Sequence, residues 1–462
     1  MTAPTTSVPQ GRSRVEEPGV PAGRRASACA RQVRRVVATE VRTSPALLPI
    51  AALTVIGCLR LASADAQWVG YWQNTTLKVH TYACIVIGIV SGAIAAWQAG
   101  RSRAAGLHPM ENTATVDGAS IVLRAVAPIW LLATTGFLLV LAAALGRSAV
   151  VHAGTPPWGL VVMTVAVLGM QVAAGAALGA WLPRRSAPVV TIVVLYAGGA
   201  APVYVEGGER TWGRLYPIVQ QLWDPLMREA PARLLTASAW LMCVAVLLVL
   251  VAGRRWAGVR PSLTSLAAAA TLAAVSAGFV LVPQVAPGEQ FASVRGAGDP
   301  VACTNGSGPT FCVWADHADT LPSVAGAASA FARATDGLTF IPTTLAEPGV
   351  ARALGRPAVD VGAFTAPVPS REEALAALVT ASAPQPGPTC IGADGAVIGG
   401  SDAARAIPAI LSERLGIPPV FGADSAAYPR LEQLTVARQN AWMNAAAEAE
   451  VHCAEPPPVP AS

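Results

Sequence analysis

Long apolar runs separated by short polar connections dominate residues 44–283, and a mixed pattern occupies the rest of the chain. A helix needs about 20 apolar residues to cross the roughly 30 Å of hydrocarbon in a bilayer. The runs that approach this length are 45–63, 80–98, 121–145, 158–182, 188–205, 234–252 and 262–283. Gly198, Gly199 and Pro202 interrupt the fifth run, which we retain because neighbouring helices can cover the backbone exposed at such residues. The pattern predicts a transmembrane domain of about seven spans over residues 44–283.

Two segments precede the first span. Residues 1–27 mix Pro, Gly, Ser, Thr and Arg without apolar periodicity, which predicts a disordered tail. In residues 28–43, valines fall on one helical arc and arginines on the opposite arc. This second segment is either a short amphipathic helix that lies in the membrane interface or an unstructured basic flank.

Residues 284–462 have a different pattern, in which strand-like runs meet helical stretches. The helical stretches lie at about 319–335, 371–383, 401–416 and 427–451. Ser370 and Ser401 are suitable N-caps for two of them. The segment is long enough for one compact domain. We therefore predict a mainly α-helical, polytopic membrane protein with a small C-terminal α/β domain.

Composition supports this class. Of the 462 residues, 53% are hydrophobic and only 13% are charged, and the mean hydropathy is +0.48, well above the usual range of soluble domains. The net charge of +5 could suggest nucleic-acid binding, but the basic residues form short clusters between apolar runs, as membrane flanks do. We expect no nucleic-acid partner.

The distribution of arginine predicts the orientation. The N-terminal tail carries eight arginines, and the connections after the second, fourth and sixth spans carry further pairs or triplets. Such loops stay in the cytoplasm. The loop at 206–233 departs from the count because it holds four arginines and several acids, and we place it outside with its neighbours. An odd number of spans then leaves residues 284–462 outside the cell.

Four cysteines lie in that outer segment, which favours two disulfides in an oxidising compartment. Metal binding would need C-x₂-C spacing or nearby histidines, and redox catalysis would need C-x-x-C. The Asn305-Gly306 turn between strand-like runs predicts a hairpin that joins Cys303 to Cys312. Cys390 and Cys453 remain as the second pair, and the other four cysteines are expected to be small apolar filler.

No catalytic constellation is evident. The zinc-protease and nucleophile-elbow signatures are absent. Asp316, His317 and Asp319 form the best titratable cluster, which we interpret as an exposed loop. The single lysine, Lys78, lacks the glycine framework of a phosphate-binding loop, so any nucleotide hydrolysis would come from another chain. We expect no enzyme activity, metal or cofactor.

One polar residue lies deep inside a span. Gln171, near the middle of the fourth run, cannot reach either membrane interface. It either donates a hydrogen bond to another helix or lines a substrate path. No acidic residue lies deep in a span, so a proton-coupled or sodium-coupled carrier would lack its usual carboxylate.

Three segments of residues 28–252 resemble parts of the permease subunits of type 2 ABC transporters. The amphipathic segment at 28–43 resembles their interfacial connecting helix, "GRSRAAGLHPMENTATVDGAS" their cytoplasmic coupling element, and "RTWGRLYPIVQQLWDPLM" their short outer re-entrant helices. The resemblance is topological, and this chain adds a seventh span and an outer domain to the six-span core of that family. It implies that a separate ATPase binds the loop that carries Arg101, Arg103 and Glu111.

These observations lead to two main hypotheses. The first is a membrane subunit of an ABC-type complex in a bacterial plasma membrane. It would be powered by a separate ATPase subunit, paired with itself or with another permease, and in contact with membrane lipid. Its substrate would be amphipathic. The alternative is a non-transporting membrane anchor whose outer domain binds a ligand or partner. An extracytoplasmic hydrolase, a third hypothesis, lacks catalytic residues.

Overall fold

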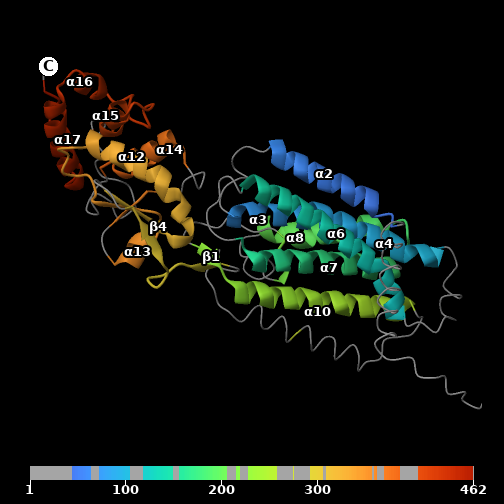
Figure 1. Ribbon diagram of the computed structural model, residues 1–462. Coiled ribbons are helices and arrows are strands. Elements are labelled where there is room, and N and C mark those ends of the chain that lie inside the picture. The colour runs from blue at the N-terminus through green and yellow to red at the C-terminus, as the bar shows by residue number, and fades with distance from the viewer. Residues whose placement is uncertain are drawn as a thin grey trace, which may run out of the picture.

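The computed structural model describes two parts, a bundle of helices and an outer lobe (Figure 1). The described residues are 44–63, 72–104, 118–148, 156–204, 215–218, 227–256, 274, 292–304, 309–355, 358–361, 369–384 and 404–460. Several predictions lie outside them: the tail at 1–27, the segment at 28–43, Glu111, Cys390, Ser401 and, apart from Ala274, the seventh run at 262–283.

The helices of the bundle have the length and the apolar composition of helices embedded in a membrane. Among the described residues, four segments are long and apolar enough to cross a bilayer, namely Trp72–Arg101, Gly118–Arg147, Trp158–Trp181 and Pro231–Arg255. Two shorter apolar helices accompany them, Leu47–Leu61 and Ala187–Gly199. The full helices are α2 (Leu47–Ser63), α3 (Trp72–Tyr82), α4 (Ile89–Ala104), α6 (Gly118–Ser148), α7 (Trp158–Trp181), α8 (Ala187–Tyr204) and α10 (Pro231–Trp256). The mainly helical class is thereby confirmed.

The second predicted span is longer than the sequence indicated. A π-helical segment, Ala83–Gly88, joins α3 to α4, so the helix is continuous from Trp72 to Ala104. Its first eleven residues were expected to belong mostly to an outer loop because they are polar on average. They are helical because the bundle buries one side of them, including Thr75, Thr76 and His80. Tertiary packing therefore overrides the local hydropathy.

Helix α7 is the centre of the bundle and packs against α4, α6, α8 and α10. Small residues bring α4 and α7 together. A Cβ atom on Gly175 would collide with the carbonyl oxygen of Gly92, and one on Gly179 would collide with the carbonyl oxygen of Ala96. The two backbones can lie this close only because these positions carry little or no side chain.

The outer lobe contains a four-stranded sheet covered by helices. The strand order is β3 (Val301–Cys303), β4 (Thr310–Trp314), β5 (Thr344–Ala346) and β6 (Val359–Asp360). The first pair is antiparallel and the other two pairs are parallel. The helices are α12 (Leu321–Ala334), α13 (Val350–Leu354), α14 (Arg371–Ala381), α15 (Ala406–Leu415), α16 (Tyr428–Glu432) and α17 (Val436–Val451). Phe311 and Phe331 are fully buried in the core between sheet and helices.

Two local predictions can be compared with this lobe directly. The β3–β4 pair places Cys303 opposite Cys312, and a disulfide joins them across a Cα–Cα distance of 4.1 Å. Cys453 is also disulfide-bonded, and its pairing with Cys390 stays a prediction because Cys390 lies outside the described residues. Ser370 caps α14, since its hydroxyl oxygen accepts a hydrogen bond of 3.1 Å from the Glu373 N–H.

A two-stranded ribbon joins the lobe to the bundle. Strand β1 (Met227–Glu229) pairs antiparallel with β2 (Ala292–Val294), with Glu229 opposite Ala292. Strand β1 comes directly before α10, and β2 comes directly before the outer lobe. The lobe therefore lies at the end of the bundle where α10 begins (Figure 1).

Candidate functional site

Gln171 is fully buried in the bundle and joins two neighbouring segments. Its Nε2 donates to the carbonyl oxygen of Cys84 at 2.9 Å and to the hydroxyl oxygen of Tyr216 at 2.6 Å. Cys84 lies in the π-helical segment, where the altered backbone pairing allows a carbonyl to accept from outside the helix. Of the two roles considered for Gln171, the structure contains the hydrogen bond to another helix.

The carbonyl oxygen of the same amide is the unsatisfied group of this site. Gln171 Oε1 is buried and has no hydrogen-bond partner within the described part of the chain. It lies against Gly88, where any Cβ atom would collide with it. Gly88, the last residue of the π-helical segment, is therefore required to make room for the amide.

His80 extends the polar network toward the end of the bundle that carries the lobe. The ring is fully buried, with Nδ1 2.8 Å from Thr164 Oγ1 and Nε2 2.8 Å from the Pro217 carbonyl oxygen. A neutral ring that donates from Nε2 to Pro217 accepts at Nδ1 from the Thr164 hydroxyl. That hydroxyl also lies 2.7 Å from the Leu160 carbonyl oxygen, so it has two acceptors within reach.

His80 was not among the predicted site residues, because it lies at the predicted edge of a span. The sequence feature that could have indicated a buried position for His80 is its nearness to Thr75 and Thr76, which are also buried in the structure. A histidine and two threonines at the start of an apolar run are costly in a bilayer unless other helices satisfy them. Such a cluster can indicate an interior helix face.

Tryptophan and arginine side chains gather at the other end of the bundle. The guanidinium groups of Arg101 and Arg184 lie 5.9 Å and 4.7 Å from the centroid of the Trp97 ring, and that of Arg255 lies 5.2 Å from Trp181. These cation–π contacts join helix ends that are distant in sequence. The predicted coupling loop starts here: Arg101 belongs to this cluster, whereas the side chain of Arg103 lies outside the described residues, as does all of Glu111.

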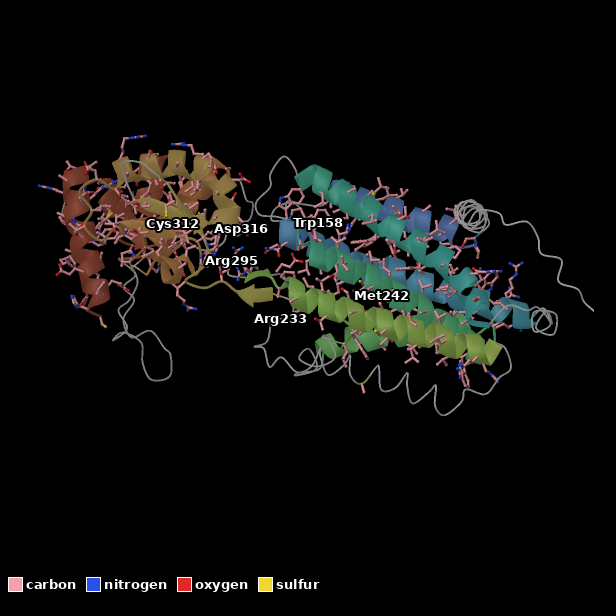
Figure 2. The ribbon with its side chains drawn as sticks, turned by 60° about the horizontal axis from the view of Figure 1, so that its bottom comes forward. Trp158, Arg233, Met242, Arg295, Cys312 and Asp316 are labelled. Carbon is pink, nitrogen blue, oxygen red and sulfur yellow. A yellow bond between two sulfur atoms is a disulfide. The ribbon has the colours of Figure 1, made fainter. Side chains whose placement is uncertain are left out.

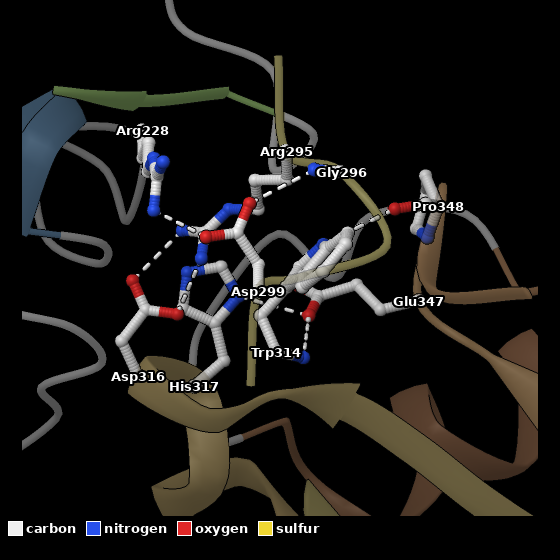
Figure 3. A network of polar contacts seen from close by, with 9 residues as sticks. All are labelled: Arg228, Arg295, Gly296, Asp299, Trp314, Asp316, His317, Glu347 and Pro348. Carbon is white, nitrogen blue, oxygen red and sulfur yellow. Dashed lines mark hydrogen bonds and ion pairs between the residues drawn. The ribbon is translucent and has the colours of Figure 1, made fainter. Parts of the chain in front are cut away.

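A second polar network holds the root of the outer lobe (Figure 3). Arg295, directly after β2, is buried and makes two hydrogen bonds of 2.7 Å to the carboxylate of Asp316. Its guanidinium also lies 5.1 Å from the centroid of the Trp314 ring. Arg228 of β1 forms an ion pair with Asp299. Figure 2 shows Arg295 and Asp316 on the side of the lobe that faces Trp158 and Arg233 of the bundle.

The sequence predicted an exposed loop for the cluster of Asp316, His317 and Asp319. The cluster is not such a loop: His317 is buried and Asp316 is half-buried, and of the three residues only Asp319 is exposed. It forms a 3₁₀ helix, Ala315–Thr320, in which His317 is buried. His317 Nδ1 lies 2.7 Å from Glu347 Oε1, and Glu347 Oε2 accepts from the Trp314 N–H at 3.2 Å. Burial alone would raise the pKa of Asp316, but Arg295 and the neighbouring His317 lower it below its ordinary value. The contacts of Asp316 and His317 therefore stabilise the lobe. Within the described residues, no three His, Cys, Asp or Glu side chains are arranged to hold a metal ion.

Glu229 connects the ribbon to the central helix. It closes β1 and lies against the first turn of α7 at Gly159. Burial raises the pKa of its carboxyl group, while the backbone N–H groups of Gly159 and Leu160 oppose that rise. A carboxylate at a helix N-terminus is stabilised by the unpaired N–H groups there.

Comparisons with known proteins give no assignment. No family model, no curated protein and no solved structure matches this chain.

Proposed function

We propose that the chain is the membrane subunit of an ABC-type complex that moves or extracts an amphipathic substrate with energy from a separate ATPase. The observation that supports this most directly is the continuous helix from Trp72 to Ala104. One end of it leads into the predicted coupling loop, and its π-helical middle holds the buried network of Gln171. Force applied by a partner at the loop would reach the network through one rigid element.

The positions of α10 and β2 support one further crossing after α10. Helix α10 has 26 residues and is therefore about 39 Å long. The chain leaves it at Trp256 and next appears in β2, whose Ala292 is opposite Glu229 beside the start of α10. If α10 crosses the membrane, the connection between them crosses back. We therefore infer a seventh crossing, with the lobe on the side opposite the Trp97 and Trp181 clusters.

The arginine pattern favours the cytoplasm for those clusters. Arg101, Arg184 and Arg255 lie at the end of the bundle opposite the lobe, and the N-terminal tail adds eight more arginines. Arginine-rich connections are retained inside. The lobe and its disulfide then lie outside, in an oxidising compartment that suits the Cys303–Cys312 bond.

The alternative is a membrane anchor whose outer lobe binds a ligand or a partner protein. The ribbon and the Arg295 network favour this hypothesis in one respect, because they fix the orientation of the lobe on the bundle. A receptor needs such a fixed platform, but so does a transporter whose outer domain guides its substrate. The two hypotheses differ in whether an ATPase is required.

Affinity purification of the full chain from its native cells in mild detergent tests this difference. We expect a co-purified ATPase without transmembrane segments, and ATP hydrolysis by the purified complex. Arg101→Glu combined with Arg103→Glu should reduce both. Arg371→Glu, an exposed change in the outer lobe, is the control. Absence of any ATPase from the wild-type complex would exclude the transporter and leave the anchor.

A further inference from the structure

Helix α17 ends in a turn that sends the chain back along the helix. Cys453 adopts a φ of 56°, and the Ala454 N–H donates to the Ala449 carbonyl oxygen at 2.8 Å, as in a Schellman turn. Residues 455–460, "EPPPVP", follow this turn, and we call them the proline segment. The Trp442 N–H donates a hydrogen bond of 2.8 Å to the Pro457 carbonyl oxygen. Because Trp442 lies about three helical turns before Cys453, the proline segment runs antiparallel to α17.

The proline segment has the character of a polyproline II ligand. Proline fixes its own φ and biases the residue before it toward an extended conformation. Three residues of the segment are partly buried and three are exposed: Pro456, Pro457 and Val459 are in the first group, and Glu455, Pro458 and Pro460 in the second. Glu455 and Pro458 are three residues apart, which is the period of a polyproline II helix. One side of the segment therefore packs on the lobe, and the other side is open to solvent.

The contacts between the proline segment and the lobe are few, and one of them is polar. Trp442 is only 3% exposed, and a buried N–H group is costly without an acceptor. Val459 packs against the apolar core of the lobe. Four of the six residues are prolines, which have no N–H group, and in the described part of the chain the segment makes no backbone–backbone hydrogen bond. The surface around Trp442 thus needs a carbonyl group at this place, but the segment that supplies it is held by few contacts.

We propose that the face of α17 around Trp442 is a binding site for a proline-rich segment of a partner protein, and that the proline segment occupies this site until the partner displaces it. Proline-rich segments are already extended before they bind, so they lose little conformational entropy, and aromatic surfaces recognise them. Helix α17 lies on the side of the lobe away from the bundle, where a partner can reach it without crossing the membrane (Figure 1). The site goes beyond the transporter proposal and does not depend on it.

A partner protein is favoured over a second copy of this chain as the occupant. Exchange of the proline segment between two copies would replace each contact with an identical one. The two copies would also lose the translational and rotational freedom that any association costs. A partner with a longer proline-rich segment can add contacts beyond those that residues 455–460 make, and these contacts can offset that cost.

Fluorescence polarisation of a labelled peptide with the sequence EPPPVP tests the proposal in mild detergent. It is measured with the full chain and with a chain shortened after Ala454. An attached segment competes at an effective concentration of about 1 mM, so a peptide that binds the shortened chain with a Kd of about 0.1 mM should bind the full chain about tenfold more weakly. A peptide with alanine at the four proline positions should bind neither chain.

Two tryptophan variants of the shortened chain test the role of the indole N–H. Trp442→Phe keeps a ring at the site but removes the donor, and should weaken peptide binding about fivefold. Trp314→Phe is the matched control, because the Trp314 N–H also donates to a proline carbonyl oxygen, that of Pro348 at 3.2 Å, elsewhere in the lobe. This control should bind the peptide as the shortened chain does. Equal affinities of the two variants would contradict a site at Trp442.

Val459→Asp in the full chain weakens the attached segment without removing it. This variant should bind the peptide with an affinity closer to that of the shortened chain than to that of the wild type. The proposal is overturned by equal affinities of the full and shortened chains, or by absence of binding to both the shortened chain and Val459→Asp. A lobe that unfolds in both of these variants would make the proline segment part of the core and overturn it as well. Dimers of the full chain that disappear on shortening would assign the site to exchange between two copies, against the proposal.

Discussion

The membrane bundle and the outer lobe hold their helices together in different ways. In the bundle, glycines let backbones touch, as Gly175 does with Gly92, and many large apolar side chains face outward. In the lobe, Phe311 and Phe331 are fully buried, and a disulfide and ion pairs reinforce the sheet and its connections. Helices that pack together in lipid remove no apolar surface from water, so the close fit of their surfaces stabilises the bundle. In the lobe, the burial of apolar side chains away from water stabilises the fold.

The strongest challenge to this comparison is a side chain at the closest helix contact. Gly175→Leu should collide with the Gly92 backbone and separate α4 from α7, at a cost of about 3 kcal/mol or more. Gly326→Leu in α12 of the lobe is the matched control, because a Cβ atom there meets nothing within 4 Å. Fluorescence-detected size exclusion after heating measures both. Equal melting temperatures for the two variants would show that the close fit of α4 and α7 does not determine the stability of the bundle.

Removal of the hairpin disulfide should affect the lobe alone. Cys303→Ala with Cys312→Ala opens a loop of about ten residues, which the chain-entropy relation converts to about 3 kcal/mol. Limited proteolysis should then cut the lobe at lower temperature while the bundle stays resistant. Cys243→Ala, a cysteine without a disulfide in the bundle, is the control. A bundle that becomes protease-sensitive in the double variant would mean that the two parts do not unfold separately.

Features that depend on a few neighbouring residues could be predicted from the sequence, and features that depend on distant packing partners could not. The first six apolar runs, the Cys303–Cys312 hairpin and the Ser370 cap are of the first kind. The structure contains helices over those six runs, four of them long and apolar enough to cross a bilayer, as well as the disulfide and the cap. The polar helix before Tyr82 and the burial of His317 are of the second kind. No local pattern could indicate their partners, because His317 pairs with Glu347 and His80 with Pro217.

Acid should weaken the root of the lobe through Asp316. Its pKa is lower in the folded protein than the ordinary 3.8, because Arg295 and His317 more than offset the effect of burial. The stabilisation is therefore complete above about pH 4 and is lost as the pH falls through the lowered value. Asp316→Asn should lose about 2 kcal/mol at pH 7 and show a flatter stability profile in acid. Asp424→Asn is the control, since its ion pair with Arg405 is exposed and contributes little.

Loss of the α14 cap should have a smaller effect. Ser370→Ala removes the acceptor of the Glu373 N–H and should cost about 1 kcal/mol, whereas Ser370→Gly should cost only a few tenths. Helix α7 of the bundle has no side-chain cap from Pro157, and Glu229 lies against its first turn instead. Chemical denaturation of the full chain, followed by a probe in the lobe, measures the difference. Identical midpoints for the wild type and Ser370→Ala would contradict it.

The smallest expected change in stability is at Gln171, although the residue is fully buried. Hydrogen bonds between helices in lipid contribute only about 0.6 kcal/mol on average and up to about 1.7 kcal/mol, because the separated helices also find partners. Gln171→Leu should therefore lower bundle stability by about that amount. Thr134→Val is the control, since its buried hydroxyl has no hydrogen-bond partner among the described residues and its removal should be neutral. Steric trapping in bicelles can resolve both values. A cost above about 3 kcal/mol at Gln171 would mean that polar pairing, and not only helix shape, holds the bundle together.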